Sequence, residues 1–329
     1  MKIVQAGYEI YPVSDGENTL KKVEQIARVC YKSEDKITED SYKRMIGTLV
    51  KNEHLAMLEH GSIILDVNFS VYYEMTGSVN RLERDYNEKI YLRFTNKEYS
   101  GRYIISGNMR AWLEFLEACS RHGFIVANRV LEALFVLKYS SVFDRARHLA
   151  VEAFNYGKVE EIYYKDLTDK EKLVHGDISV KFTVDRGVSH EIVRHRVASF
   201  AQESTRYCNY GNKGGEITVI EPCYLKPDGV ENWEARYGAW KTACEVSERE
   251  YIRMIETGAT PQEARAVLPN SLKTEVVMTA NLTEWLHFFY LRALGKTGKP
   301  HPQMVEVAVP LLKEMAVMEP AIFGGLLNE

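Results

Sequence analysis

Apolar positions along the chain alternate between two spacings. Residues 178–185 (ISVKFTVD) and 272–280 (LKTEVVMTA) are rich in β-branched residues, which predicts strands. Residues 108–122 and 281–294 repeat apolar side chains every three or four positions, which predicts helices. The mixture predicts an α+β fold, with a mixed or antiparallel sheet flanked by long helices.

The same two spacings extend this prediction over most of the chain. Strands are expected at residues 2–10 and 62–73, and a charged loop or exposed turn at 163–177. Further helices are expected at residues 19–33, 39–52, 128–139, 141–156, 231–258 and 301–318. We expect the last of these helices to bend or to begin afresh at Pro310.

The helix predicted at 231–258 carries an aromatic stripe. Its members recur at helical spacing on one side and are Trp233, Tyr237, Trp240, Cys244, Tyr251 and Ile255. Such a stripe is more typical of a core or a subunit interface than of a ligand site.

Two pairs of segments resemble each other in the same order. HGSIILDVNFSV (60–71) resembles HGDISVKFTV (175–184), and YIISGNMRAWLEFL (103–116) resembles VVMTANLTEWLHFF (276–289). One interpretation is a partial duplication, in which the first copy has lost the basic residues of the second. The other is that strand-to-helix units look alike because asparagine is a favoured helix N-cap.

Composition and charge exclude several classes of protein. The chain has 329 residues, 45% of them hydrophobic, and a net charge of -4, so it lacks the basic field of a general nucleic-acid or membrane-surface binder. Its five cysteines lack the paired spacing of a metal or disulfide framework, so we expect no metal. No apolar run is long enough to cross a bilayer, and the N-terminus lacks a signal peptide, which predicts a cytoplasmic protein.

Hydrogen-bond donors are concentrated in residues 191–212, EIVRHRVASFAQESTRYCNYGN, which hold three arginines, a histidine, two serines and a threonine. Arg194, His195 and Arg196 are consecutive and therefore face at least two surfaces. Ser204, Thr205 and Arg206 follow, and their hydroxyls, backbone N–H groups and guanidinium suit a phosphate. The segment predicts a site that brings two phosphorylated ligands together. A surface ion-pair network is the ordinary alternative. A Ser204 nucleophile is disfavoured because no oriented carboxylate is evident.

A second group of polar residues lies nearer the C-terminus. Each has an ordinary structural explanation: Arg265 as an ion-pair partner, Asn281 as a helix N-cap, Arg292 as a cap of helix carbonyls, and His287 and His301 as packed or surface histidines.

Taken together, these motifs resemble those of flavin-dependent thymidylate synthases. RHRVASFAQES has the form of an RHR triplet, seven residues and a serine, and STRY follows directly. ARVCY and HLAMLEH near the N-terminus, and ARAVLP, LR and HPQ downstream, also look like that family. The resemblance covers residues 20–70 and 175–325, which leaves an insertion at about 70–175 within a single domain of 1–329.

The resemblance implies reductive methylation of dUMP to dTMP. Methylenetetrahydrofolate supplies the carbon, FAD carries the hydride and NADPH reduces the flavin. It also implies a homotetramer with FAD bound between subunits. Neither a nucleic acid nor a membrane is an expected partner.

The resemblance also implies roles for individual residues. Arg292 is the expected catalytic residue, because a cation beside the uracil ring stabilises the negative charge that hydride attack leaves there. The positions expected to bind dUMP are Glu191, Arg194, Gln202, Ser204, Thr205, Arg206, Arg265 and Arg292. The positions expected to bind FAD are Arg194, His195, Arg196, Gln202, Asn281, Thr283, His287 and His301.

Four positions depart from the family pattern. Gln202 stands where shorter members often carry glutamate, and Glu191 stands where glutamine is common. A charged Glu191 opposes a phosphate, so we expect it to face the base or an arginine. Cys30 and Ala56 replace hydroxyl residues that often contact FAD.

Two other functions fit the same residues. One is a related flavin- and folate-dependent pyrimidine nucleotide hydroxymethylase. The other is a non-catalytic nucleotide-binding protein on the same scaffold.

Overall fold

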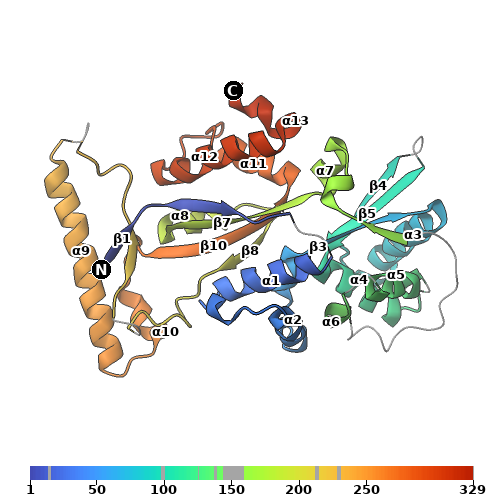
Figure 1. Cartoon of the computed structure of the whole chain (residues 1–329), viewed down its shortest axis with the longest axis horizontal. Helices are drawn as coiled ribbons and strands as arrows, with labels where there is room; N and C mark the ends of the chain where they lie inside the picture. The colour runs from blue at the N-terminus through green and yellow to red at the C-terminus, as the bar shows by residue number, and fades with distance from the viewer. Residues whose placement is uncertain are drawn as a thin grey trace. The chain divides into compact units, whose positions relative to one another are not determined.

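The computed structural model describes residues 1–13, 16–97, 101–124, 126–136, 139–143, 159–211, 215–227 and 231–328 (Figure 1). The chain divides into two units. The first contains Met1–Tyr11, Arg28–Ser33 and Ser179–Glu329, and the second contains Pro12–Ala27 and Glu34–Ile178. The single domain with an insertion at about 70–175 stays a prediction. The helix expected at 141–156 lies mostly outside the described residues.

The first unit is built on a four-stranded sheet in the order β2-β7-β10-β8. These strands are Gly7–Ile10 (β2), Asp177–Asp185 (β7), Lys273–Asn281 (β10) and Ser199–Gln202 (β8). β2 runs antiparallel to β7, and β8 runs antiparallel to β10. A separate parallel pair joins β1 (Lys2–Val4) to β9 (Thr218–Ile220), so the unit is mixed, as the sequence predicts.

Helices α11 (Leu282–Arg292) and α12 (Pro302–Met318) pack with this sheet, and α13 (Pro320–Phe323) follows them (Figure 1). Phe182 of β7 lies 6.4 Å from Trp285 and 6.0 Å from Phe288 between ring centroids. All three side chains are fully buried. The aromatic residues that α11 turns inward therefore form the core beneath the sheet.

The long helix α9 (Trp233–Glu256) packs on the same unit through its predicted stripe. Trp240 contacts a cluster around buried Cys244 and Leu272, and its indole N–H donates to the Ser271 hydroxyl at 2.8 Å. Part of the stripe is therefore core. The short helix α10 (Pro261–Ala264) follows α9.

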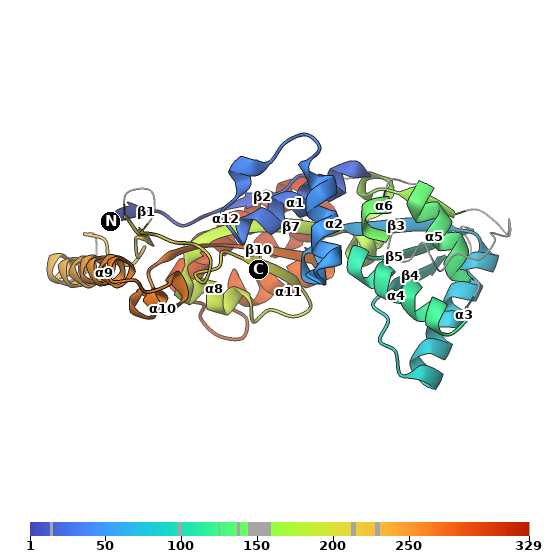
Figure 2. The same ribbon diagram turned by 90° about the horizontal axis from the view of Figure 1, so that it is seen from below.

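The second unit has its own antiparallel sheet, in the order β4-β5-β3-β6. Its strands are Arg93–Lys97 (β4), Arg102–Asn108 (β5), Ser62–Val67 (β3) and Val159–Ile162 (β6). Helices α3 (Phe69–Tyr86), α4 (Met109–Arg121) and α5 (Val126–Val136) gather beside the sheet (Figure 2). The remaining helices are α1 (Glu17–Val29, whose last two residues belong to the first unit), α2 (Ser41–Lys51), α6 (Ser140–Phe143) and α7 (Asp169–His175).

Short 3-10 helices complete the secondary structure of the described residues. They cover Glu34–Lys36, Leu55–His60, Tyr164–Asp166, Arg265–Val267 and Gly324–Asn328.

Three strands of each sheet share one connectivity, whereas the fourth does not, because β6 follows β5 in the chain and β2 precedes β7. In the second unit, β3 leads into α3, β4 pairs with β5, and β5 leads into α4. In the first, β7 leads into α8 (Arg186–Ile192), β8 pairs with β10, and β10 leads into α11. The strand orders β4-β5-β3-β6 and β8-β10-β7-β2 then correspond position by position. This correspondence favours the duplication interpretation of the sequence.

All four strand-to-helix junctions use the same cap. The side chains of Asn68, Asn108, Asp185 and Asn281 each accept a hydrogen bond from the backbone N–H three residues later, at 2.8–3.0 Å. This contact satisfies one of the unpaired N–H groups at each helix start.

Several elements differ from the sequence prediction. The single strand expected at 2–10 is two strands, β1 and β2, which pair in different sheets. The strand expected at 62–73 ends at Val67, because the Asn68 cap starts α3 within the aromatic run. The loop expected at 163–177 contains α7, which Thr168 and Glu171 begin as a capping box. Helix α12 runs from Pro302 to Met318 with Pro310 inside, so of the two outcomes expected at Pro310 the structure excludes only a new helix start.

Candidate functional site

The RHR triplet lies in a turn just after the short helix α8. Asp185 caps the start of α8, and its other carboxylate oxygen accepts from the amide of Gln303 at 2.8 Å. The helix ends at Ile192, so the triplet is neither helix nor strand. His195 is buried, whereas Arg194 and Arg196 are exposed. The two guanidiniums therefore face solvent while the imidazole faces the protein.

His195 packs against the beginning of α11. Its ring lies 5.4 Å from His287 and 5.7 Å from Phe288 between centroids. Its Nε2 lies 3.4 Å from the Glu284 carboxylate, which also accepts from the backbone N–H of Val197 at 3.2 Å. Burial lowers the pKa of His195, and Glu284 opposes this only in part. The imidazole is therefore neutral near pH 7.

A second contact joins the end of α8 to the end of α11. The guanidinium of Arg292 donates from Nη1 to the Glu191 carboxylate at 3.2 Å and from Nη2 to the Glu191 backbone carbonyl at 3.3 Å. Glu191 thus faces an arginine, one of the two alternatives expected from sequence. Both side chains keep access to solvent, at 36% for Glu191 and 24% for Arg292. A ligand can therefore reach the pair from outside.

Gln202 occupies the last position of β8, beside the start of β10. Its amide donates to the Ser189 hydroxyl at 2.9 Å and to the Thr274 hydroxyl at 3.3 Å. The carbonyl oxygen of this amide can accept from a ligand, because Nε2 makes both contacts.

The segment after β8 forms a tight turn that displays polar groups. The Ser204 carbonyl accepts from the N–H groups of Tyr207 and Cys208 at 3.2 and 2.9 Å, and its hydroxyl accepts from the Arg206 N–H at 3.3 Å. The Arg206 side chain is exposed and lies 5.6 Å from the Tyr207 ring centroid. Ser204 is half-buried and Thr205 is buried. Arg206 is thus the member of this set that reaches furthest into solvent.

The remaining predicted positions lie on three other elements. Asn281 caps α11, and Thr283 in its first turn is exposed. Arg265 begins a 3-10 turn and is exposed. His301 caps α12 through Nδ1, which accepts from the Gln303 N–H at 3.3 Å. The structure therefore brings His195 to His287 and Glu191 to Arg292, and it gives Asn281 and His301 capping contacts.

Sequence reasoning missed three residues that hold this site together: Glu284, Ser189 and Thr274. Glu284 stands three residues after the Asn281 cap, a spacing at which an acidic residue is typical of a helix start. That spacing predicts a helix terminus but not the contact with His195. Ser189 and Thr274 carry no motif.

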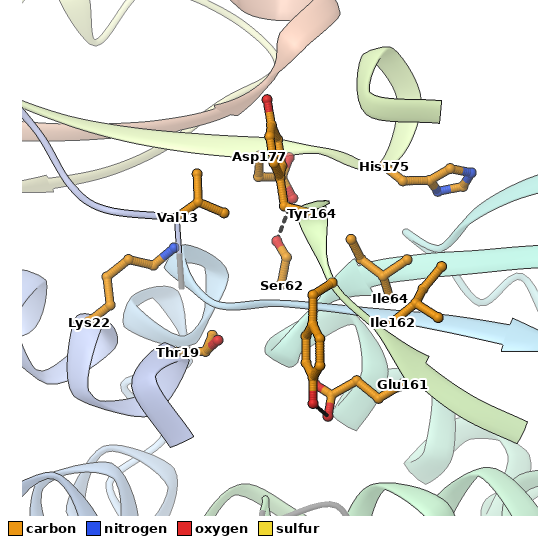
Figure 3. Close-up of a pocket in the computed structure, with 11 residues that line it drawn as sticks. Val13, Thr19, Lys22, Ser62, Ile64, Glu161, Ile162, Tyr164, His175 and Asp177 are labelled. Atoms are coloured by element: carbon orange, nitrogen blue, oxygen red, sulfur yellow. Dashed lines mark hydrogen bonds between the residues drawn. The ribbon is translucent and has the colours of Figure 1, made fainter. Parts of the chain in front are cut away.

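The second unit contains a pocket outside this set, lined by both polar and apolar residues (Figure 3). Lys22 and Thr19 of α1 lie on one side of it and Glu161 and Ile162 of β6 on the other. Burial lowers the pKa of Lys22 to about 8, although the Asp177 carboxylate opposes the shift.

Asp177 itself is fully engaged at this pocket. It accepts from the Ser62 hydroxyl and from both terminal nitrogens of Arg93, at 3.0 and 2.7 Å. Burial alone would raise the pKa of Asp177, but Arg93, Ser62 and Lys22 together hold it below its usual value. The carboxylate is therefore charged at neutral pH.

Two further properties concern the described residues as a whole. Within these ranges, no helix is long and apolar enough to cross a membrane. The same residues contain no group of three or more His, Cys, Asp or Glu side chains arranged to hold a metal ion.

A family model, described as "Thymidylate synthase complementing protein", matches residues 139–321. This match covers more than half of the chain and includes every predicted site position. The chain belongs to this family. This match confirms the family that the sequence motifs predict.

Individual relatives carry the name "Flavin-dependent thymidylate synthase". The protein of Geobacter sulfurreducens is 31% identical over 140 residues, or 43% of this chain and 56% of the relative. That of Pyrococcus horikoshii is 37% identical over 131 residues, or 40% of this chain and 51% of the relative. The matched region thus spans about half the length of these relatives.

Among solved structures, one similar chain is the UMP/dUMP methylase PolB of Streptomyces cacaoi bound with 5-Br UMP. It is 14% identical, with a TM-score of 0.41 over 96% of this chain and 91% of PolB.

Proposed function

We propose that the chain is a FAD-dependent enzyme that converts dUMP to dTMP, with methylenetetrahydrofolate as carbon donor and NADPH as reductant. Family membership supports a flavin enzyme that acts on a pyrimidine nucleotide. The observation that carries the proposal is the pairing of Arg292 with Glu191 beside an exposed Arg194 and Arg196. A homotetramer and a cytoplasmic location belong to the same proposal.

The residues around α8 fit a bound flavin dinucleotide. Two exposed guanidiniums, Arg194 and Arg196, suit a diphosphate, because an arginine fork binds phosphate oxygens through two parallel N–H donors. The buried, neutral His195 lies between them in sequence and packs on His287, so it can hydrogen-bond without adding charge. Bound FAD would supply a hydride donor and acceptor.

The remaining positions proposed to bind FAD differ in which of their atoms can reach the cofactor. Thr283 and His287 are exposed at the start of α11 and can contact a ligand there. The Asn281 oxygen already caps the helix, so its amide nitrogen is the group left for FAD. His301 is exposed, but its Nδ1 caps α12, so only Nε2 can serve the cofactor. Gln202 would contact both FAD and dUMP through its amide oxygen.

The proposed nucleotide site has two sets of residues, one that would bind the phosphate and one that would bind the base. Ser204, Thr205, Arg206 and Arg265 would hold the phosphate, and Arg194 would lie close to both ligands. Arg292 would face the uracil ring, where its charge stabilises the negative charge that develops on the base when a hydride adds at C6. Glu191 would lie at the base end of this site, where its carboxylate holds the Arg292 guanidinium until the uracil ring binds.

The decisive experiment follows the flavin and the product in one preparation. The purified protein is expected to bind FAD, with a visible flavin spectrum, and to form dTMP from dUMP, methylenetetrahydrofolate and NADPH. Mass spectrometry of the nucleotide identifies the product. A hydroxymethylated nucleotide would instead indicate the related hydroxymethylase, and a protein that stays colourless after FAD is added would indicate a non-catalytic nucleotide-binding protein.

Arg292→Ala tests the catalytic assignment within the same assay. It should abolish dTMP formation while most of the bound flavin is retained, because Arg292 is assigned to the base and not to the cofactor. Full activity in this variant would refute the assigned role.

A further inference from the structure

Four charged side chains form a closed network behind the Ser204 turn. The Lys273 ammonium lies 3.1 Å from the Glu203 carboxylate and 2.9 Å from that of Glu275. Lys32 contacts the same two carboxylates, Glu203 at 3.5 Å and Glu275 more closely. The charges of the two lysines and two glutamates cancel within the network, so each cation already has two anionic partners.

Glu203 is the most buried member of this network. Its side chain is only 3% exposed, and its second oxygen accepts from the Tyr210 hydroxyl at 2.9 Å. A carboxylate buried to this degree is stabilised only while its cations and donors stay in place. The position of Glu203 is therefore closely defined.

The network joins three segments that are distant in sequence. Lys32 lies in the turn after α1, Glu203 directly follows β8, and Lys273 and Glu275 belong to β10. The Glu203 N–H also donates to the Glu275 carbonyl at 2.8 Å. The turn after β8 is thus fastened to β10 by both backbone and side chain.

The segment that carries Lys32 also contacts the Ser204 turn directly. The Ser204 N–H donates to the Cys30 carbonyl at 3.1 Å. The ring of Tyr31 lies 5.4 Å from that of Tyr207. Three neighbouring residues, Cys30, Tyr31 and Lys32, therefore hold the turn from one side.

This arrangement bears on phosphate binding because Glu203 immediately precedes the proposed phosphate donors. Donors bind an anion strongly only when they are already held at the right positions, since ordering them on binding costs affinity. A shift of Glu203 displaces the backbone of Ser204 and with it the hydroxyl and the N–H groups of the turn.

We propose that Lys32, Glu203, Lys273 and Glu275 are positioning residues, which hold Ser204, Thr205 and Arg206 in the arrangement that binds the phosphate of the pyrimidine nucleotide. This inference rests on the proposed function. The lysines act through the turn and not by contact with the phosphate, because both are already paired with carboxylates.

Direct phosphate binding by the lysines predicts the opposite result for one substitution. If Lys32 bound the phosphate itself, Glu203→Gln would remove a competing anion and tighten dUMP binding. If the network positions the turn, Glu203→Gln and Lys32→Met both weaken dUMP binding. The sign of the Glu203→Gln effect therefore separates the two.

The test uses the flavin-loaded full chain and compares Glu203→Gln, Lys32→Met and Lys32→Arg. We expect the first two to raise KM and Kd for dUMP about tenfold, with kcat within twofold and bound flavin per subunit unchanged. Lys32→Arg keeps the charge and should stay within threefold of the unmodified chain. Lys181→Met, which breaks the peripheral Lys181–Glu9 ion pair of β7 and β2, is the matched control and should change nothing.

Tighter dUMP binding by Glu203→Gln, or unchanged binding by all variants, overturns the inference. If Glu203→Gln loses flavin or fails to fold, Lys32→Met still decides, because Lys32 is 30% exposed and tolerates truncation better. If the unmodified protein binds flavin but not dUMP, the proposed function fails first and this inference fails with it. If the unmodified chain binds dUMP normally and the variants bind it equally well, the positioning role is refuted and the proposed function is not.

Discussion

Replacing Glu191 by glutamine tests whether its carboxylate restrains Arg292. The guanidinium donates to the Glu191 carboxylate at 3.2 Å and to its backbone carbonyl at 3.3 Å. Glu191→Gln removes the negative charge but keeps the backbone acceptor and nearly the same side-chain shape. A uracil ring that binds beside Arg292 would then no longer compete with a carboxylate for the guanidinium.

The expected gain follows from the exposure of the pair. Glu191 and Arg292 are 36% and 24% exposed, so their interaction is screened by solvent and is worth about 0.2–1 kcal/mol. Loss of that competition corresponds to a Kd for dUMP roughly 1.4- to 5-fold lower. The gain should shrink as salt is added, because screening already weakens the native pair.

Isothermal titration of dUMP into the flavin-loaded protein, at low and at high salt, measures this effect. Glu9→Gln is a suitable control, because it removes a carboxylate from a peripheral ion pair with Lys181. Binding weakened more than threefold by Glu191→Gln would refute the reasoning. It would mean that the Glu191 carboxylate itself holds the base and that its contact with Arg292 supports this role.

Three further predictions concern stability. The Lys32 and Lys273 ammonium groups overcome the effect of burial and lower the pKa of Glu275 to about 2. The pKa of Asp177 is also lowered. The two carboxylates therefore stabilise the folded state fully only above their pKa values in the unfolded chain. The free energy of unfolding from urea titrations should therefore fall as pH drops from about 4.5 towards 2, and Glu275→Gln should flatten this fall; an equally steep curve would contradict the assignment. Because burial lowers the pKa of Lys22 to about 8, the folded state binds fewer protons than the unfolded state between about 8 and 10.5. Unfolding free energy should rise over that window, and Lys22→Met should lose the rise; its persistence in the variant would assign it to another group. Asn108→Ala removes the cap of α4 and should cost about 1 kcal/mol in chemical denaturation, whereas an unchanged midpoint would show that the cap contact contributes nothing.

Elements with a regular apolar period could be predicted from the sequence almost to their ends. The strand expected at 272–280 is β10, Lys273–Asn281, and the helix expected at 108–122 is α4, Met109–Arg121. Both are buried along most of their length, so the residues that define the period also form the core. Caps at their junctions fix the boundaries.

Predictions failed where a local signal competed with the period. Residues 62–73 are rich in β-branched and aromatic side chains, yet the chain turns to helix at Phe69 because Asn68 caps the new N-terminus. The charge of 163–177 suggested a loop, although its Thr168 and Glu171 have capping-box spacing that could have indicated α7. At Pro310 only the expectation of a new helix start failed, because α12 continues through it, with buried Val307 and Leu311 on either side.

The types of residue in the candidate site could be predicted from the sequence, but the contacts between them could not. The spacing of the RHR triplet and the serine located the segment that carries the donors. The partner of each donor could not be read in the same way, because Lys32 meets Glu275 across 243 positions and Arg292 meets Glu191 across 101. Such pairs depend on which strands become neighbours, which no local pattern records.

The two units differ in the helix that follows the corresponding strands β3 and β7. Both units place a capped helix after the equivalent strands β3 and β7, with buried His60 and His175 just before them. In the first unit, helix α8 stops after seven residues and the chain turns, which exposes Arg194 and Arg196. In the second unit, helix α3 continues for 18 residues and its basic residues stay on a regular helix surface. A turn after a short helix can direct two nearby arginines toward one ligand, whereas a continuous helix rotates by about 100° per residue and so separates them. The length of this one helix therefore distinguishes the unit that contains the RHR triplet from the unit that does not.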